Sequence, residues 1–204
     1  MTGPDEYTTL VNNNWYTNFI ARWCIAYCLE VNAKVQNPLP QKLSSQEIDK
    51  FEHIVANVYL PQLEGTQTFL QQDGFMDKEQ LSTADLPVAE RPINQHWSWD
   101  RILRSIFIKQ ADVLQGLYLF EDQFSEEVIR ENFDFYEPKT VHESSLSPCV
   151  HVILAAKIKR LDKALELYLR TSRLDLDDYN HEADEGLHIT SMAGTWMSVV
   201  EGLA

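Results

Sequence analysis

Apolar residues recur at helical intervals through most of this chain, and the alternation typical of β-strands is nowhere sustained. Spacings of three and four residues place side chains on one face of a helix, whereas a half-buried strand needs a period of two. The first such run extends from Trp15 to about Val31 and contains Trp15, Phe19, Ile20, Trp23, Tyr27 and Leu29. The chain is therefore predicted to be all-α, built from short helix pairs.

Capping and breaking residues predict where the helices begin and end. Asn37–Pro40 should stop the first helix, and Ser44–Glu47 has capping chemistry for a second helix that fails at Pro61. Leu63–Trp99 lacks periodicity, and a long loop inside a compact domain usually serves a site. Further helices are expected from Asp100 to Phe120 with an interruption near Lys109, from Ser125 through Arg130, from Ser144 to about Ile158, from Leu161 to Arg170 and from Met192 to about Val200, with a loop over Asp134–His142.

The charge of the chain limits its partners. Seventeen basic and 31 acidic residues give a formal net charge of -14, and no basic stripe interrupts the acidic excess. Nucleic acid and anionic membrane surfaces are therefore poor partners. No apolar run approaches the roughly 18 residues that a membrane helix needs. Met1–Pro4 does not have the sequence of a signal peptide, so we expect a cytoplasmic protein.

The three cysteines lack a CxxC pair, which agrees with a reducing compartment. Cys24 and Cys28 share one face of the first helix, and a spacing of four residues is compatible with a metal ion. No histidine stands at ligand spacing nearby, so we interpret both cysteines as small buried apolar residues. We expect no metal site.

A polar cluster occupies the start of the chain, in Thr2–Tyr7 and Asn12–Asn18. Glycine and proline followed by two acids form a tight turn that can direct a carboxylate out of a helical framework, which suits a general acid. Two acids after a proline are also common at a helix start. The residues alone therefore leave both interpretations of Asp5 and Glu6 open.

Lys109 and Gln110 interrupt an apolar run, with Asp112 close by. Such a pair is commonly exposed on a helix surface. Between apolar neighbours, however, these side chains would bury donors without partners unless they face a polar ligand such as sugar hydroxyls. We keep both interpretations, an exposed helix pair and a sugar contact.

A third cluster contains hydroxyl and imidazole groups near two predicted helix starts. Ser144 and Ser145 either cap the helix that begins there or, with His142 and the free N–H groups of that helix, form an anion site. His188, Thr190 and Ser191 would supply the other side of this phosphate site, although a histidine at a helix start is often structural.

The acidic run Asp175–Tyr179 lacks the glycine and the distal glutamate of an EF-hand, so we interpret it as loop structure. Asp177 or Asp178 could act as a helper carboxylate near the site. Glycine-rich phosphate cradles of the nucleotide type are absent, and ATP and NAD are therefore not implied.

Together these clusters resemble the inverting disaccharide phosphorylases of glycoside hydrolase family 65. The resemblance covers nearly the whole chain, with blocks in family order at Thr2–Tyr7, Asn12–Asn14, Tyr16–Asn18, Ile108–Val113, Phe133–Pro138, Thr140–Pro148, Arg173–Asn180 and Gly186–Trp196. It implies that Glu6 is the catalytic acid and that Lys109 and Gln110 bind the glucose being transferred. It also implies a phosphate site formed by Ser144, Ser145, His188, Thr190 and Ser191.

The same resemblance implies a reaction of an α-glucosidic disaccharide with inorganic phosphate, which gives β-glucose 1-phosphate and free glucose. A phosphorylase needs only the acid, because phosphate is already an anionic nucleophile. Phosphate is then a substrate, and no cofactor or metal is expected. Arg91–Asp100 resembles the branch that acts on maltose, while branches acting on trehalose, trehalose 6-phosphate and kojibiose share the other blocks.

The fold implied by the resemblance is a partial (α/α)6 barrel that contains the later barrel helices. Residues 1–204 are expected to lack the family's N-terminal β-sandwich, the first barrel helices and the C-terminal β-domain. We therefore expect this chain to be inactive alone, or stable only with a complementary fragment, and the full-length enzyme to be a homodimer. The alternative from another class is a noncatalytic helical interaction module, in which the polar clusters are caps and loop contacts.

Overall fold

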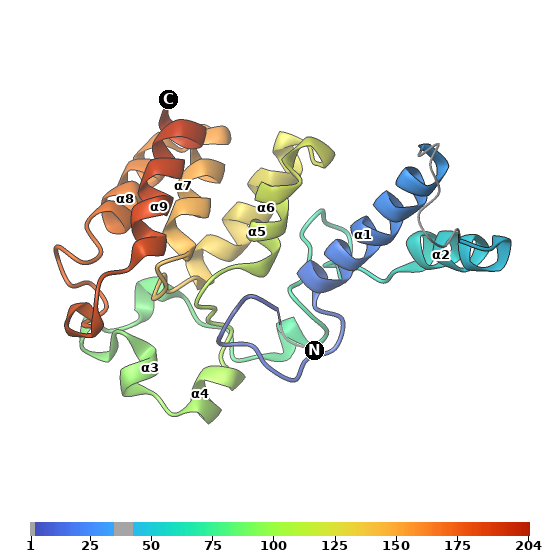
Figure 1. Cartoon of the computed structure of the whole chain (residues 1–204). Helices are drawn as coiled ribbons and strands as arrows, with labels where there is room; N and C mark the ends of the chain where they lie inside the picture. The colour runs from blue at the N-terminus through green and yellow to red at the C-terminus, as the bar shows by residue number, and fades with distance from the viewer. Residues whose placement is uncertain (1–2, 35–42) are drawn as a thin grey trace.

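The computed structural model describes residues 3–34 and 43–204 (Figure 1). All regular elements of these residues are helical, and β contacts are limited to isolated bridges, which confirms the all-α prediction. The α-helices are α1 (Trp15–Lys34), α2 (Ser45–Asn57), α3 (Ile93–His96), α4 (Trp99–Arg104), α5 (Asp112–Leu119), α6 (Glu126–Tyr136), α7 (Ser147–Lys157), α8 (Leu161–Ser172) and α9 (Ile189–Met197). Short 3-10 helices span Phe75–Asp77, Thr83–Asp85, Val88–Glu90, Glu121–Gln123, Glu137–Lys139 and Ala183–Glu185, and a π-helical segment spans Ser198–Leu203.

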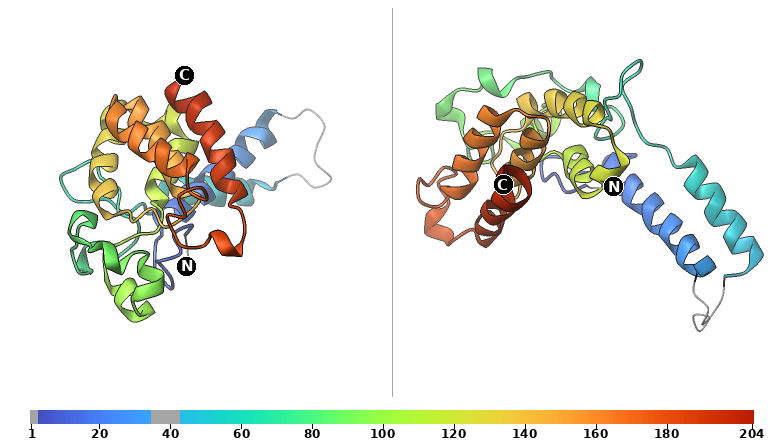
Figure 2. Two further views of the ribbon diagram at one scale, coloured as in Figure 1. Left: turned by 90° about the vertical axis from the view of Figure 1, so that its left-hand side faces the viewer. Right: turned by 90° about the horizontal axis from the view of Figure 1, so that it is seen from above.

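The helices of the second half form two rows (Figures 1 and 2). In one row α7 packs between α5 and α9, and in the other α6 covers α5 and α7 while α8 covers α7 and α9. Each residue from Ser147 to Ala155 of α7 is buried. A helix that is buried on all sides belongs to the core, so α7 is the centre of this double row.

Helix α1 joins the double row through its first turns only. Trp15 is fully buried and stacks on Phe19 and Phe69, with ring centroids 4.9 Å apart in each case. Beyond Phe19 no α1 side chain is buried, and the hairpin of α1 and α2 extends away from the other helices (Figure 2). Cys24 and Cys28 are exposed, so their expected burial is wrong. The predicted stop at Asn37–Pro40 lies outside the described residues.

Residues 105–111 differ most from the predicted pattern. Instead of one interrupted helix, α4 and α5 flank an extended segment. The Ile106 N–H donates to the Glu79 carbonyl, the Ile108 N–H to the Lys139 carbonyl, and the Val141 N–H to the Ile108 carbonyl. The apolar side chains of this run are buried because the segment threads between neighbours, not because it is helical.

Several predicted helix boundaries are correct and others shift. The capping box of Ser44 and Glu47 is present, and Ser125 caps α6 by accepting from the Val128 N–H. Helix α6 runs to Tyr136, because Phe133 and Tyr136 continue its buried face past the predicted end at Arg130. Helix α7 begins three residues after Ser144, at Ser147. None of the helices in the described ranges is long and apolar enough to cross a membrane.

Candidate active site

The candidate site lies at the N-terminal ends of the row α5, α7 and α9. Lys109 and Gln110 end the extended segment before α5, Ser144 and Ser145 occupy the turn before α7, and His188 is the N-cap residue of α9. Helix N-termini present free N–H groups and the positive end of the helix dipole. Three such ends on one side of the molecule favour an anionic ligand.

Glu6 belongs to a loop that passes in front of the α5 end. Its Oε2 accepts a hydrogen bond from Lys109 Nζ at 2.7 Å, although the two residues are 103 positions apart. The Glu6 side chain is 55% exposed and that of Lys109 15% exposed. The carboxyl group is thus reachable by a ligand while its partner is nearly enclosed.

The neighbouring Asp5 is fully buried and holds this loop in place. Its Oδ1 accepts from the backbone N–H groups of Lys109, at 2.9 Å, and Tyr7, at 3.2 Å. Its Oδ2 accepts from Thr8 Oγ1 at 2.8 Å and Gln71 Nε2 at 2.9 Å. Burial raises the pKa of Asp5, and these donors oppose that effect.

A second buried carboxyl group, that of Asp112, lies beside Asp5. Asp112 Oδ1 accepts from the Asp5 N–H at 2.6 Å, and its Oδ2 accepts from Asn14 Nδ2 at 2.7 Å. Burial, followed by the negative charge of Asp5, raises the pKa of Asp112 to about 8. Gly3 is required here, since a Cβ at this position would lie 1.9 Å from Asp112 Oδ2.

A third buried acid anchors the other side of the Glu6 loop. Glu143 Oε2 accepts from the Tyr7 hydroxyl at 2.7 Å, and Oε1 accepts from the Ile93 N–H at 2.9 Å. Burial raises the pKa of Glu143 and also that of Tyr7. Residues on both sides of Glu6 are therefore fixed by interior carboxyl groups, which leaves Glu6 as the acid of this loop that faces solvent.

Hydrogen bonds connect the Glu6 loop to the turn before α7, and that turn to the first turn of α9. Gln110 Nε2 donates to the Pro4 carbonyl at 2.6 Å, and Gln110 Oε1 accepts from Ser144 Oγ at 2.6 Å. Ser145 Oγ and Thr190 Oγ1 are 2.6 Å apart. The predicted sugar residue Gln110 and three of the predicted phosphate residues thus lie in two neighbouring hydrogen-bonded groups.

His188 is oriented by two acids. The backbone N–H of His188 donates to Asp175 Oδ2 at 2.9 Å. In the ring, Nδ1 lies 2.6 Å from Asp175 Oδ1 and Nε2 lies 3.5 Å from Glu182 Oε2. Burial acts to raise the pKa of Asp175, but the hydrogen bonds from His188 outweigh it and the pKa is lowered. The imidazole is therefore held at the α9 end by an ionised carboxylate.

Three residues lie elsewhere than the sequence suggested. The Ser191 hydroxyl is buried between α8 and α9, where it donates to the Thr171 carbonyl, so its side chain is not among the groups gathered at the helix ends. Asp177 pairs with Arg173, and Asp178 accepts from the N–H groups of the turn at residues 182–183. Asp175, and neither Asp177 nor Asp178, is the residue of this acidic run that contacts His188.

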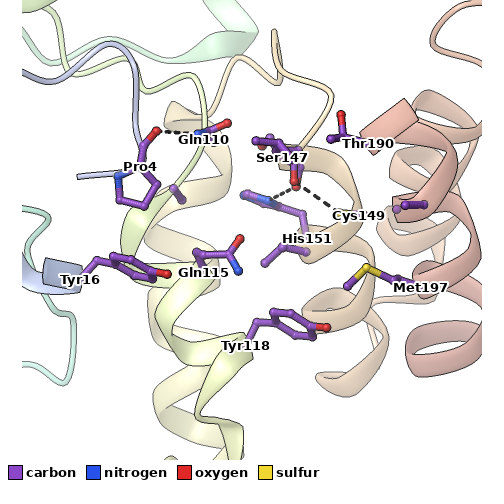
Figure 3. Close-up of a pocket in the computed structure, with 15 residues that line it drawn as sticks. Pro4, Tyr16, Gln110, Gln115, Tyr118, Ser147, Cys149, His151, Thr190 and Met197 are labelled. Carbon is purple, nitrogen blue, oxygen red and sulfur yellow. Dashed lines mark hydrogen bonds between the residues drawn. The ribbon is translucent and has the colours of Figure 1, made fainter. Parts of the chain in front are cut away.

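A cavity of about 350 Å³ adjoins the site (Figure 3). The cavity shares Pro4, Gln110 and Thr190 with the hydrogen-bonded groups described above, and α5, α7 and α9 supply most of the remaining wall. His151 faces the cavity from α7, with Nδ1 3.0 Å from the Ser147 carbonyl. Burial lowers the pKa of His151 to about 4, so its ring is neutral near pH 7.

The arrangement provides one solvent-facing carboxyl group, an ammonium and an amide beside it, and hydroxyl and imidazole groups at helix N-termini. These are donors suited to a sugar and to an oxyanion. Within residues 3–34 and 43–204, no cluster of three or more His, Cys, Asp or Glu side chains is arranged to hold a metal ion.

The sequence does not show that the acids around Glu6 are buried. Asp112 stands alone among apolar residues, which is the same signal that drew attention to Lys109. Asp5 is one of the two candidate acids after the Gly-Pro turn, but its burial has no sequence signal, and Glu143 stands next to other polar residues in the chain. Their burial depends on contacts between segments that are far apart in sequence.

Comparison with known proteins supplies the family. Residues 1–197 match the glycosyl hydrolase family 65 central catalytic domain. The chain is 55% identical to a maltose phosphorylase of Bacillus subtilis (strain 168) over 206 residues, which cover 100% of this chain and 27% of that protein. It is 39% identical to an α,α-trehalose phosphorylase of Thermoanaerobacter brockii, over 99% of this chain and 27% of that protein.

The fold also matches a solved structure of a putative kojibiose phosphorylase from the human microbiome. The TM-score is 0.89 at 38% sequence identity, and the match covers 99% of this chain and 28% of the other. The chain thus spans 27% of the length of the Bacillus relative. This chain belongs to glycoside hydrolase family 65, and its helices form part of the (α/α)6 barrel of the family's central catalytic domain.

Proposed function

We propose that this chain supplies the catalytic acid and the phosphate site of an inverting maltose phosphorylase. The reaction converts maltose and inorganic phosphate into β-glucose 1-phosphate and glucose. Maltose is preferred over the other family substrates because identity to the Bacillus maltose phosphorylase, at 55%, exceeds the 39% and 38% of the trehalose and kojibiose relatives. The residues responsible act within the complete enzyme, meaning the polypeptide that carries the whole catalytic domain.

The observation that carries this proposal is the contact between Glu6 and Lys109 at the end of α5. In the reaction Glu6 donates its proton to the glycosidic oxygen as the bond from that oxygen to the anomeric carbon breaks. A phosphate oxygen attacks the anomeric carbon from the opposite face, which inverts its configuration. When sugar binds, Lys109 and Gln110 donate to its hydroxyl groups, and Lys109 thereby releases Glu6 to carry a proton.

Phosphate is held by Ser144, Ser145, Thr190 and His188, at the ends of α7 and α9. The hydroxyl groups of Ser145 and Thr190 bond to each other in the structure, and both are free to turn their hydrogens toward an oxyanion. Ser191 contributes less, because its hydroxyl group already donates to Thr171. The reaction needs no cofactor, since phosphate is the nucleophile. The complete enzyme is proposed to be a homodimer.

The experiment that tests the acid is Glu6→Gln in the complete enzyme, with Glu52→Gln on the exposed helix α2 as the matched control. Glutamine has nearly the same shape but cannot donate a proton, so turnover of maltose should fall by about 10²- to 10⁴-fold. The control should keep wild-type turnover. Circular dichroism of both variants should match the wild type.

Two outcomes would replace the proposal. Full turnover by Glu6→Gln would favour a noncatalytic role for these polar clusters. Release of glucose from maltose without phosphate would indicate a hydrolase, which requires a second carboxylate to activate water.

Initial rates with trehalose, trehalose 6-phosphate and kojibiose should be lower than with maltose, and a faster rate with any of them would change the assigned substrate.

A further inference from the structure

We propose that Asp5 is the positioning residue that sets Glu6 against Lys109. This inference deepens the proposed function and rests on it. A single atom, Asp5 Oδ1, accepts the N–H of Lys109 at 2.9 Å and the N–H of Tyr7 at 3.2 Å. Those two amides belong to Lys109 itself and to the residue that follows Glu6. One interior oxygen therefore joins the backbones that carry the acid and its ammonium partner.

The position of that oxygen is itself fixed. Asp5 Oδ2 accepts from Thr8 and Gln71, and the Asp5 N–H donates to Asp112 Oδ1 at 2.6 Å. The side chain is 0% exposed, so water cannot replace any of these partners without opening the loop. Rotation of the Asp5 carboxyl group would break all four of its accepted hydrogen bonds together. The geometry of the Glu6 and Lys109 pair is therefore tied to the interior rather than to solvent-exposed contacts.

The two Asp5 oxygens have different partners, so the positioning of Glu6 and Lys109 can be tested separately from the general stability of the loop. The bonds to Oδ1 come from the segments that carry the proposed catalytic groups, whereas the bonds to Oδ2 come from Thr8 and Gln71, which contact neither Glu6 nor Lys109 by hydrogen bond in the described residues. A variant that keeps an acceptor at Oδ1 should keep the geometry. A variant that moves the acceptor should lose it even if the negative charge remains.

Asp5→Asn and Asp5→Glu make this distinction in the complete enzyme. Asparagine keeps an oxygen at the Oδ1 position and loses the charge. Gln71 can reverse its side-chain amide to accept from the new NH₂ group, which costs only the 3.4 Å contact of its Oε1 with the Asp112 N–H. Glutamate keeps the charge but adds a methylene to a filled site, which displaces the oxygen. We expect Asp5→Asn to retain kcat. In Asp5→Glu we expect kcat to fall about 100-fold, because a misplacement of catalytic groups by about 1 Å has that effect.

Thr8→Val is the matched control, because it removes a donor to Oδ2 and leaves Oδ1 untouched. It should keep kcat even though it loses a buried hydrogen bond, because Gln71 still donates to Oδ2 and both N–H groups still donate to Oδ1. If Asp5→Glu does not fold, Asp5→Ser takes its place, since serine fits the site but cannot reach both N–H groups. The variant that displaces the oxygen is Asp5→Glu, or Asp5→Ser in its place. The inference is overturned if kcat falls as far in Asp5→Asn as in the displaced variant, or if the displaced variant keeps the wild-type kcat.

A second readout does not depend on turnover. The Lys109 side chain is 15% exposed and its ammonium group is paired with Glu6, so it should react slowly with acetic anhydride under conditions of competitive labelling. Mass spectrometry should find faster Lys109 acetylation in the displaced variant and the wild-type rate in Asp5→Asn and Thr8→Val. Equal Lys109 acetylation in all four proteins would contradict the positioning role. A wild-type enzyme without phosphorolysis would instead refute the proposed function and leave this labelling test in force.

Discussion

At the scale of single residues, His151 illustrates how burial changes an ionisable group. The ring is 1% exposed, its Nδ1 faces the Ser147 carbonyl, and Nε2 lacks a hydrogen-bond partner in the described structure. The ring of His142 lies 4.5 Å away, and burial followed by the proximity of His151 lowers the pKa of His142 as well. Both rings are therefore neutral in the folded protein near pH 7.

This burial predicts a loss of stability in mild acid. The pKa of His151 falls from 6.5 in the unfolded chain to about 4 in the folded protein, so the unfolded state binds more protons between these values. The stabilising contribution is complete above pH 6.5 and is lost as the pH falls toward 4. Relative to His151→Phe, which does not titrate, the wild type should lose about 3 kcal/mol over this range.

Hydrogen exchange of the α7 peptide reports this difference locally. At pH 7 and at pH 4.5, wild type and His151→Phe are compared at the same pH, which cancels the intrinsic pH dependence of exchange. The wild type should lose protection relative to the variant at the lower pH. An unchanged difference between the two proteins would mean that His151 is accessible to protons in the folded state.

Glu6 and Lys109 show what residue patterns can and cannot predict. Two acids after a Gly-Pro turn and a lysine inside an apolar run marked these residues as candidates, with a structural interpretation left open for each, and the structure brings Glu6 and Lys109 within 2.7 Å. Their catalytic roles come from the resemblance and stay predictions. The burial of Asp5 and Glu143 could not be predicted from the sequence, because distant segments cover both residues.

At the scale of secondary-structure elements, helix periodicity predicted α1, α2, α7 and α8 well. It failed between α4 and α5, where Ile106, Phe107 and Ile108 are consecutive buried residues. Periodicity does not distinguish a buried extended segment from part of a buried helix. The backbone hydrogen bonds from Ile106 to Glu79 and from Ile108 to Lys139 decide the outcome, and both partners are remote in sequence.

The contact between α1 and α5 depends on a glycine. A Cβ on Gly116 would lie 2.5 Å from Trp15 Cζ3, and Trp15 is held between the rings of Phe19 and Phe69. Alanine at this position gains about 1 kcal/mol in helix propensity. The rigid indole cannot move aside, so we expect overpacking to outweigh that gain.

Gly116→Ala should therefore destabilise the enzyme by about 1–3 kcal/mol. Chemical denaturation measures this change, and Gln115→Ala on the same helix is the control, since Gln115 borders the cavity rather than Trp15. The control should unfold near the wild-type midpoint. A Gly116→Ala variant more stable than the wild type would show that α1 can shift on α5.

At the scale of the whole molecule, the site is assembled from most of the chain. Four separate segments supply Glu6, Lys109, Ser144 and His188. Because α5, α7 and α9 run in the same direction, their N-terminal ends bring the last three residues to one side (Figure 1). Local sequence could not predict this convergence. The family resemblance could, because it implied a barrel in which these segments follow one another in order.

Exposed apolar side chains motivate a prediction about the isolated chain. Trp23 and Tyr27, which stack on each other on α1, are 40% and 52% exposed, and Trp196 and Val200 near the C-terminus are 64% and 51% exposed. Exposed apolar patches often mark a contact surface. The chain also spans only 27% of the length of the Bacillus maltose phosphorylase. Purified 204-residue chain mixed with maltose and phosphate should release no glucose 1-phosphate. Measurable release would show that these residues suffice for catalysis.

The most direct test of the central claim is the anomeric configuration of the first product. The complete enzyme is mixed with maltose and inorganic phosphate, and proton and phosphorus NMR spectra are recorded during the first turnovers. Protonation by Glu6 with phosphate attack from the opposite face predicts β-glucose 1-phosphate together with an equal amount of glucose. Formation of the α anomer, or of glucose without any sugar phosphate, would contradict it.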